Sequence, residues 1–142
     1  MVNSRAKGVG GELEAKRIFE AELGVSFKRD IEQYRAGDHG DLLCEDPDFP
    51  FVIEIKRRAG GGVDPKWWDQ VCKAAKSVGK YPLLVWRVDR AKWHYRMPVQ
   101  CIVSLGGALA GDIAEQYDWR YATETDDQDT AFMLIREVYA GA

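Results

Sequence analysis

The sequence predicts an α/β domain in which helices flank a mixed central sheet. Three observations predict it: a helical stripe of apolar residues near the start, several apolar stretches of strand length, and a second helix with its own start and stop signals between two of those stretches. A length of 142 residues suits one domain, and 46% apolar with 30% charged residues is typical of a globular protein and excludes a disordered chain.

The first half of the chain contains one helix and three strands. A helix is predicted from about Glu12 to Leu23, because apolar residues recur at helical spacing and Gly24 is a common helix stop. The short apolar stretches after it, separated by residues that favour turns, predict strands. These elements are a strand over 25–29, a loop over 35–40, and strands over 41–45 and 51–57 joined by a turn over 46–50.

The second half begins with the best-marked helix. Asp64 is a good N-cap, Pro65 suits the first helical position, and Gly79 follows Val78 as a stop. Strands are predicted over 83–88 and 99–105, and helices over 106–117 and 130–139 flank an acidic loop around Asp126. We therefore expect a core over 1–104 and an acidic helical extension over 105–142, packed on the same domain.

Several classes of protein are disfavoured. No apolar run approaches the ~20 residues of a membrane-spanning helix, and residues 1–7 do not resemble a signal peptide, so we expect no membrane partner. Cys44, Cys72 and Cys101 are odd in number and far apart, which favours reduced thiols and a cytoplasmic location. With only two histidines, no structural zinc site is expected.

Charge is distributed unevenly along the chain. The net charge is −3, but residues 1–100 carry 18 basic against 15 acidic residues, whereas residues 101–142 carry 2 against 8. The basic excess of the first segment permits a polyanionic partner without requiring one.

The most informative segment is the apolar strand that contains Glu54 and Lys56. Because side chains alternate along a strand, Ile53 and Ile55 point to one face while Glu54 and Lys56 point together to the other. A carboxylate and an ammonium in an apolar strand can serve a metal ion and a water molecule. The alternative is an ordinary ion pair on the sheet.

Asp41 is the second candidate. It follows a glycine-rich loop and begins a strand that a short turn connects to the Glu54 strand, so a hairpin would bring the two carboxylates together. Two such carboxylates repel each other unless a cation joins them, which suggests Mg²⁺. The alternative is that Asp41 only caps the loop.

Glu12 is the third candidate. It shares a helical stripe with Ala15 and Phe19, which turns its carboxylate inward, whereas the alternative is a favourable interaction with the helix dipole. On the second helix, Gln70 lies at the margin of the packing stripe and either contacts the site or is solvated.

In this order, Glu12, Asp41 and Glu54-Ile-Lys56 resemble the PD-(D/E)xK nuclease superfamily, and within it the Holliday-junction-resolvase-like branch of archaea and phages. Residues 7–12 match a Lys-Gly-x-x-x-Glu helix start, and Gln70 matches a glutamine in the following helix. The resemblance covers about residues 5–90 and departs from the pattern at Gly40, where proline is common.

The resemblance implies a restriction-endonuclease-like core and a Mg²⁺-dependent DNA endonuclease, with Mn²⁺ as a substitute and no small-molecule cofactor. It also implies that the cytoplasm is that of a bacterium, an archaeon or a phage-infected host. It implies that Asp41, Glu54 and the Ile55 carbonyl hold the ion, with Glu12 as a direct or water-mediated ligand. Lys56 would position the attacking water or offset charge on the phosphate. Basic and polar residues near the site are candidate DNA contacts: Lys7, Arg57, Arg58, Gln70 and Lys73.

Three functions are compatible with these residues. The first is a homodimeric resolvase of branched DNA, in which two-fold symmetry matches two nicks. The second is a phage nuclease that acts on duplex, flap or single-stranded DNA. The third is an inactive nuclease fold that binds DNA or a protein partner. The basic and aromatic residues over 86–96 either extend a DNA surface or form an ordinary exposed hairpin.

Overall fold

The computed structural model describes residues 4–30, 40–105 and 119–141, with side chains over 8–30, 40–102 and 119–141. It contains a six-stranded sheet in the order β1-β2-β3-β4-β5-β6. The strands are β1 (Phe27–Arg29), β2 (Leu42–Cys44), β3 (Phe51–Arg58), β4 (Tyr81–Val88), β5 (His94–Pro98) and β6 (Ala122–Thr125). Among these described strands only the β3–β4 pair is parallel, so the predicted mixed sheet is confirmed.

Helix α3 (Pro65–Val78) connects the two parallel strands, as a parallel pair requires. Its predicted ends are confirmed. The Asp64 side chain accepts a hydrogen bond from the Lys66 N–H at 2.9 Å, and Gly79 ends the helix in the left-handed conformation with φ of 69°.

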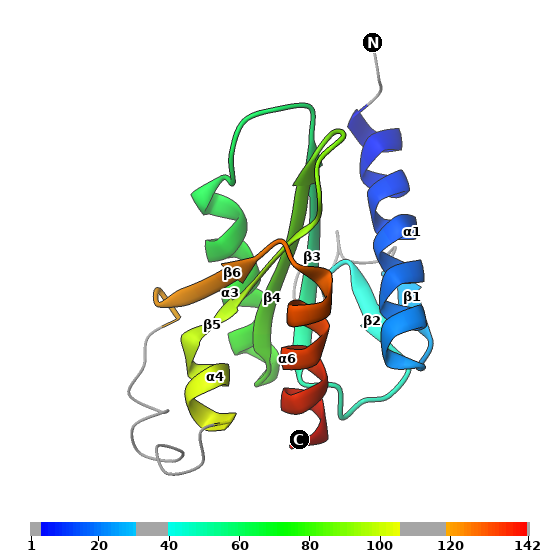
Figure 1. Ribbon diagram of the computed structural model, residues 1–142. Helices are drawn as coiled ribbons and strands as arrows, with labels where there is room; N and C mark the ends of the chain where they lie inside the picture. The colour runs from blue at the N-terminus through cyan, green and yellow to red at the C-terminus, as the bar shows by residue number, and fades with distance from the viewer. Residues whose placement is uncertain (1–3, 31–39, 106–118, 142) are drawn as a thin grey trace.

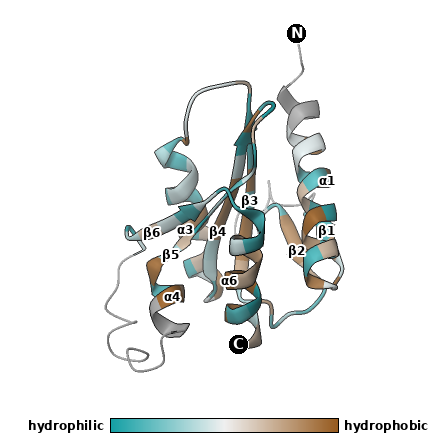
Figure 2. Cartoon of the chain, in the orientation of Figure 1, coloured by the Kyte–Doolittle hydropathy of each residue, from teal (hydrophilic) through white to brown (hydrophobic). Residues whose placement is uncertain are grey.

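The sheet is covered on both faces (Figure 1). Side chains from α1 (Ser4–Leu23), α4 (Val99–Leu105) and α6 (Gln128–Ala140) pack with Ile53, Ile55 and Val85 in one core cluster. Side chains from α3 pack with Val52 and Leu84 in the other. Alternate residues of β3 and β4 therefore serve opposite cores. Figure 2 shows β3 changing from hydrophobic to hydrophilic toward its C-terminal end.

Helix α1 begins at Ser4, well before the predicted start near Glu12. The prediction was wrong because three glycines at 8, 10 and 11 are poor helix formers. Gly11 is buried, and a Cβ atom placed on it would lie 3.5 Å from the Arg57 Cβ. Packing against β3 therefore overrides the low helix propensity of this segment.

The segment after β4 differs most from prediction. The predicted strand over 99–105 is helix α4, and the neighbouring strand is β5. A seven-residue apolar run has no periodicity that separates a strand from a buried helix, which explains the error. The β4–β5 hairpin exists, and Arg90 and Lys92 are exposed on it, but its aromatic side chains are buried, namely Trp86, Trp93 and Tyr95.

The C-terminal residues complete the sheet and one core. Strand β6, which was not predicted, pairs with β5, and α6 matches the helix predicted over 130–139. The helix predicted over 106–117 lies outside the described residues, and the division at residue 104 stays a prediction. The three cysteines are free thiols, and no described helix is long and apolar enough to cross a membrane.

Candidate active site

Asp41 is fixed at the start of β2 by its neighbour and by β3. Gly40 has a φ of +75°, and a Cβ atom there would lie 2.4 Å from the Ile53 carbonyl oxygen, so only glycine fits. The Asp41 N–H donates to that same oxygen at 2.7 Å. The Ile55 N–H then donates to Asp41 Oδ2 at 2.6 Å, which orients the carboxyl group along β3.

Glu54 and Lys56 lie on the same face of β3, as alternation predicts. Glu54 is only 5% exposed, and Lys56 Nζ lies 3.4 Å from Glu54 Oε1 with the lysine side chain partly open to solvent. The ion pair that was the alternative interpretation of these two residues is therefore present. A side-chain hydrogen bond also links Glu54 to Asp41, so the hairpin brings Asp41, Glu54 and Lys56 together.

The two carboxyl groups resist ionisation together. The pKa of Asp41 is raised to about 8, mainly by burial and next by the charge of Glu54, while the hydrogen bond from the Ile55 N–H opposes both effects. Burial also raises the pKa of Glu54, while Lys56 and the hydrogen bond from Asp41 counteract it. Close, buried carboxyl groups with raised pKa values mark a place where a positive charge is favoured.

Glu12 stands beside this pair and has a different partner. Its Oε2 atom lies 2.8 Å from Arg29 Nε, and its charge raises the pKa values of both Asp41 and Glu54. The inward orientation predicted for Glu12 is thus present, because its side chain is only 15% exposed. However, no group of three acidic, histidine or cysteine side chains in the described part of the chain is arranged as a metal site.

The donor chemistry nevertheless fits a divalent cation. Asp41 and Glu54 offer carboxylate oxygens, which are the ligands that Mg²⁺ prefers. Their raised pKa values show that two charges in this place lack sufficient compensation from the protein alone. A cation would displace the shared proton and supply that compensation.

The candidate DNA contacts lie in different surroundings. Arg57 pairs with Asp89 at 3.0 Å, and Arg58 donates to the Gly62 carbonyl at 2.8 Å while its guanidinium lies 5.2 Å from the Trp67 ring centroid. The structure places two further candidates on the solvent-exposed face of α3, namely Gln70 and Lys73. The side chain of Lys7 lies outside the described residues.

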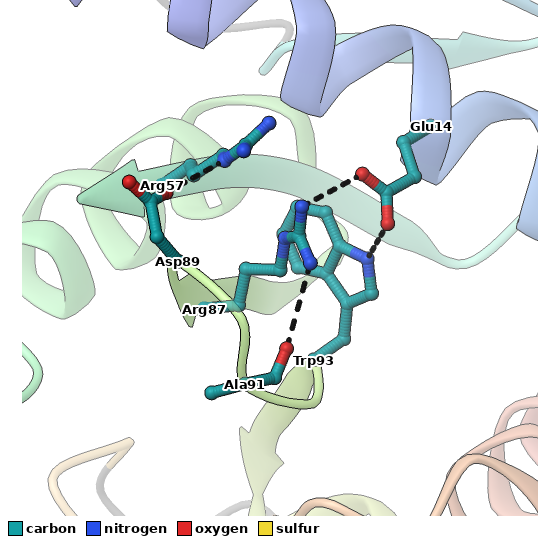
Figure 3. A network of polar contacts seen from close by, with 6 residues as sticks. All are labelled: Glu14, Arg57, Arg87, Asp89, Ala91 and Trp93. Atoms are coloured by element: carbon teal, nitrogen blue, oxygen red, sulfur yellow. Dashed lines mark hydrogen bonds and ion pairs between the residues drawn. The ribbon is translucent and has the colours of Figure 1, made fainter. Parts of the chain in front are cut away.

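Sequence reasoning missed the contacts that hold this part of α1 on both sides. Arg29, its ion-pair partner, ends a short strand and carries no motif that would have identified it. Glu14, two residues further along α1, binds Arg87 and Trp93 of the β4–β5 hairpin (Figure 3). Both contacts join segments far apart in the sequence, so no local pattern signals them.

Comparison with known proteins gives a family match and similarity to solved structures. The family model described as "Phage putative PDDEXK endonuclease" matches residues 3–137. Among solved structures, the chain is similar to Archaeoglobus fulgidus Hjc, a Holliday junction resolvase from an archaeal hyperthermophile. The identity is 20% and the TM-score 0.49, over 67% of this chain and 75% of that one. No curated protein matches the sequence.

Proposed function

The chain belongs to the phage PDDEXK endonuclease family, as its sequence motifs predicted, and we propose from this membership and from the geometry of the site that it cleaves DNA. The proposed activity is that of a Mg²⁺-dependent DNA endonuclease selective for branched DNA. The observation that carries the proposal is the contact between the buried carboxyl groups of Asp41 and Glu54, with Lys56 Nζ 3.4 Å from Glu54. These are the acidic pair and the lysine that a PD-(D/E)xK nuclease needs.

Asp41, Glu54 and the Ile55 carbonyl would hold the ion. Because Arg29 engages the carboxylate of Glu12, we assign Glu12 a water-mediated contact with the ion in preference to a direct one. When bound, a divalent cation withdraws electron density from the scissile phosphate and makes a neighbouring water more acidic. Mn²⁺ offers the same coordination chemistry and would substitute.

The protein side chains supply orientation and charge. The Ile55 N–H keeps the Asp41 carboxylate pointing along β3, and the buried position of Glu54 excludes bulk water from its carboxylate. Lys56, which is partly exposed, would hold the attacking water and offset negative charge that builds on the phosphate. The expected bond cleavage leaves a 5′-phosphate on one product strand.

DNA would lie across the side of the molecule that exposes these groups. Arg57 and Arg58 follow the site on β3, and we expect them, with Lys7, Gln70 and Lys73, to contact backbone phosphates, which supplies affinity without choice of sequence. A homodimer would place two sites on opposed strands of a junction. The free thiols of its cysteines support a cytoplasmic location.

The test compares a labelled four-way junction with a matched duplex in the presence of Mg²⁺. The wild-type protein should nick the junction symmetrically, and Glu54→Gln should abolish nicking while keeping the size and shape of the side chain. Glu45→Gln, which changes an exposed carboxylate just after β2, is the matched control and should retain activity.

Each alternative gives a distinct result in the same assay. Equal cutting of junction and duplex, lost in Glu54→Gln, would keep the nuclease site and reject junction selectivity. No cutting of either DNA with Mg²⁺ or Mn²⁺ would reject the enzyme and favour a binding module.

A further inference from the structure

The turn of α1 that carries Glu12 is attached to the β4–β5 hairpin by a partly buried polar network (Figure 3). Glu14 Oε1 accepts a hydrogen bond from Trp93 Nε1 at 3.0 Å, and Glu14 Oε2 pairs with Arg87 Nη2 at 3.1 Å. Arg87 also donates to the Ala91 carbonyl, and its guanidinium carbon lies 5.2 Å from the Trp93 ring centroid. We call Glu14, Arg87 and Trp93 the Glu14 clamp.

The clamp holds the side of the helix opposite Glu12. Residues two positions apart on an α-helix are separated by about 200° around its axis, so their side chains leave it in opposite directions. Glu12 accordingly reaches Arg29, whereas Glu14 reaches the hairpin. A rotation of α1 that released Glu14 would therefore also move the carboxylate of Glu12.

This part of α1 depends on tertiary contacts for its position. Glycines at 8, 10 and 11 each cost roughly 1 kcal/mol relative to alanine in a helix interior, so the turn has little intrinsic stability. A Cβ atom on Gly11 would lie 3.7 Å from Trp93 Cη2 and 3.5 Å from Arg57 Cβ, which shows how closely the helix approaches the hairpin and β3. The Glu14 clamp therefore joins α1 to the hairpin at a place where the two elements pack closely.

The clamp is built from polar groups although an apolar contact would also join the two elements. Arg87 has a side chain only 16% exposed, and Trp93 is 6% exposed. Because removing a guanidinium from water costs free energy, an ion pair in this position adds little to stability over a hydrophobic contact of the same volume. Hydrogen bonds, in contrast, fix direction, because they weaken steeply when donor and acceptor are misaligned.

From these observations we propose that Glu14 is a positioning residue, which holds α1 through Arg87 and Trp93 in the rotation that places Glu12 beside Asp41 and Glu54. The inference rests on the proposed function, since it assigns the clamp a role in cation binding at that site. Glu14 itself touches neither the cation nor the DNA.

The test measures Mn²⁺ binding by calorimetry in the absence of DNA. Glu14→Ala should weaken Mn²⁺ affinity about 10-fold, in the range seen when groups that orient metal ligands are removed. Trp93→Phe, which keeps an aromatic ring at this position but removes the N–H donor and part of the indole, should weaken it less but measurably. This second variant also covers the case in which Glu14→Ala does not fold.

Glu22→Ala is the matched control. Glu22 joins the far end of α1 to α6 through Gln128 and Arg136, at 3.1 and 3.2 Å, so its loss loosens the same helix away from Glu12. It should lower the melting temperature and leave Mn²⁺ affinity unchanged. An equal loss of affinity in Glu22→Ala and Glu14→Ala would overturn the positioning role.

A double-mutant cycle shows whether Glu14 acts through Glu12. In a Glu12→Gln background, Glu14→Ala should produce no further loss of Mn²⁺ affinity, since the group it positions is already gone. A full additional 10-fold loss would overturn the inference. The proposed function fails if the wild-type protein neither binds Mn²⁺ nor nicks DNA. If the wild type does both, and Glu14→Ala and Trp93→Phe bind Mn²⁺ as tightly as it does, only the positioning role is refuted.

Discussion

The Ile55 backbone nitrogen lies 2.6 Å from Oδ2 of Asp41, so a backbone donor in the middle of β3 fixes the carboxyl group that directly precedes β2. In the same hairpin the Asp41 N–H donates a hydrogen bond to the Ile53 carbonyl oxygen at 2.7 Å. This oxygen lies so close to Gly40 that a side chain there has no room. The position of the first acidic residue is thus set by β3 itself, the strand that also carries Glu54 and Lys56.

Gly40→Ala should destabilise the protein and displace Asp41. A Cβ atom at residue 40 would overlap the Ile53 carbonyl oxygen at 2.4 Å in addition to adopting a left-handed backbone, so we expect a loss of at least about 3 kcal/mol in the free energy of unfolding. Gly79→Ala is the control, because Gly79 has a similar φ of +69° with open space around it, and should cost about 1 kcal/mol. Urea denaturation of both variants measures the difference; equal losses would contradict the steric account.

The metal-free protein should lose stability as the pH rises from about 4 to about 8. The pKa of Asp41 is raised by folding from its ordinary value of 3.8 to about 8, so the folded state holds a proton that the unfolded state releases across this window. One proton gives a slope of at most about 1.4 kcal/mol per pH unit. The measurement is urea denaturation of wild type and Asp41→Asn at pH 5, 6.5 and 8. As the pH rises, the free energy of unfolding of the wild type should fall relative to that of Asp41→Asn, whose amide does not titrate. A difference between the two free energies that stays constant with pH would contradict a buried proton on Asp41.

Lys56→Met should separate cleavage from cation binding. Removing the ammonium group raises the pKa of Glu54 further, but it also removes a positive charge that competes with the cation. We expect about 100-fold slower nicking with Mn²⁺ affinity that does not fall. Lys28→Met, which changes an exposed lysine of β1, is the control and should nick normally. Loss of Mn²⁺ binding in Lys56→Met would show that the lysine organises the site and does not act in the reaction.

Phe132→Ala should destabilise the whole domain. Phe132 of α6 is fully buried and contacts the ring of Phe19 on α1, with centroids 4.9 Å apart, so the cavity should cost about 3–5 kcal/mol. Met133→Ala, at the next position but 50% exposed, should change stability by less than about 0.5 kcal/mol. The measurement is urea denaturation followed by far-UV circular dichroism and by tryptophan fluorescence. Both signals should report one and the same transition, which Phe132→Ala shifts to a lower urea concentration. A separate early transition for the C-terminal segment would contradict a shared core.

The elements that could be predicted were those with strong local signals. Helix α3 has an Asp-Pro start and a glycine stop, and β3 has an apolar run in which Glu54 and Lys56 alternate with Ile53 and Ile55. The early start of α1 and the identity of α4 could not be predicted in this way. Packing of Gly11 against Arg57 outweighs helix propensity in one case, and a short apolar run is ambiguous in the other.

The sequence by itself determined the α/β class, the hairpin that joins Asp41 to Glu54, and the set of charged residues available for chemistry, because alternation and turn composition are local properties of the chain. Only the tertiary structure decided how those charges are compensated. It pairs Glu12 with Arg29, and it attaches the other side of the same helix to Arg87 and Trp93 through Glu14. These contacts join residues 17 to 79 positions apart, and their strength depends on burial and direction, which no local pattern records.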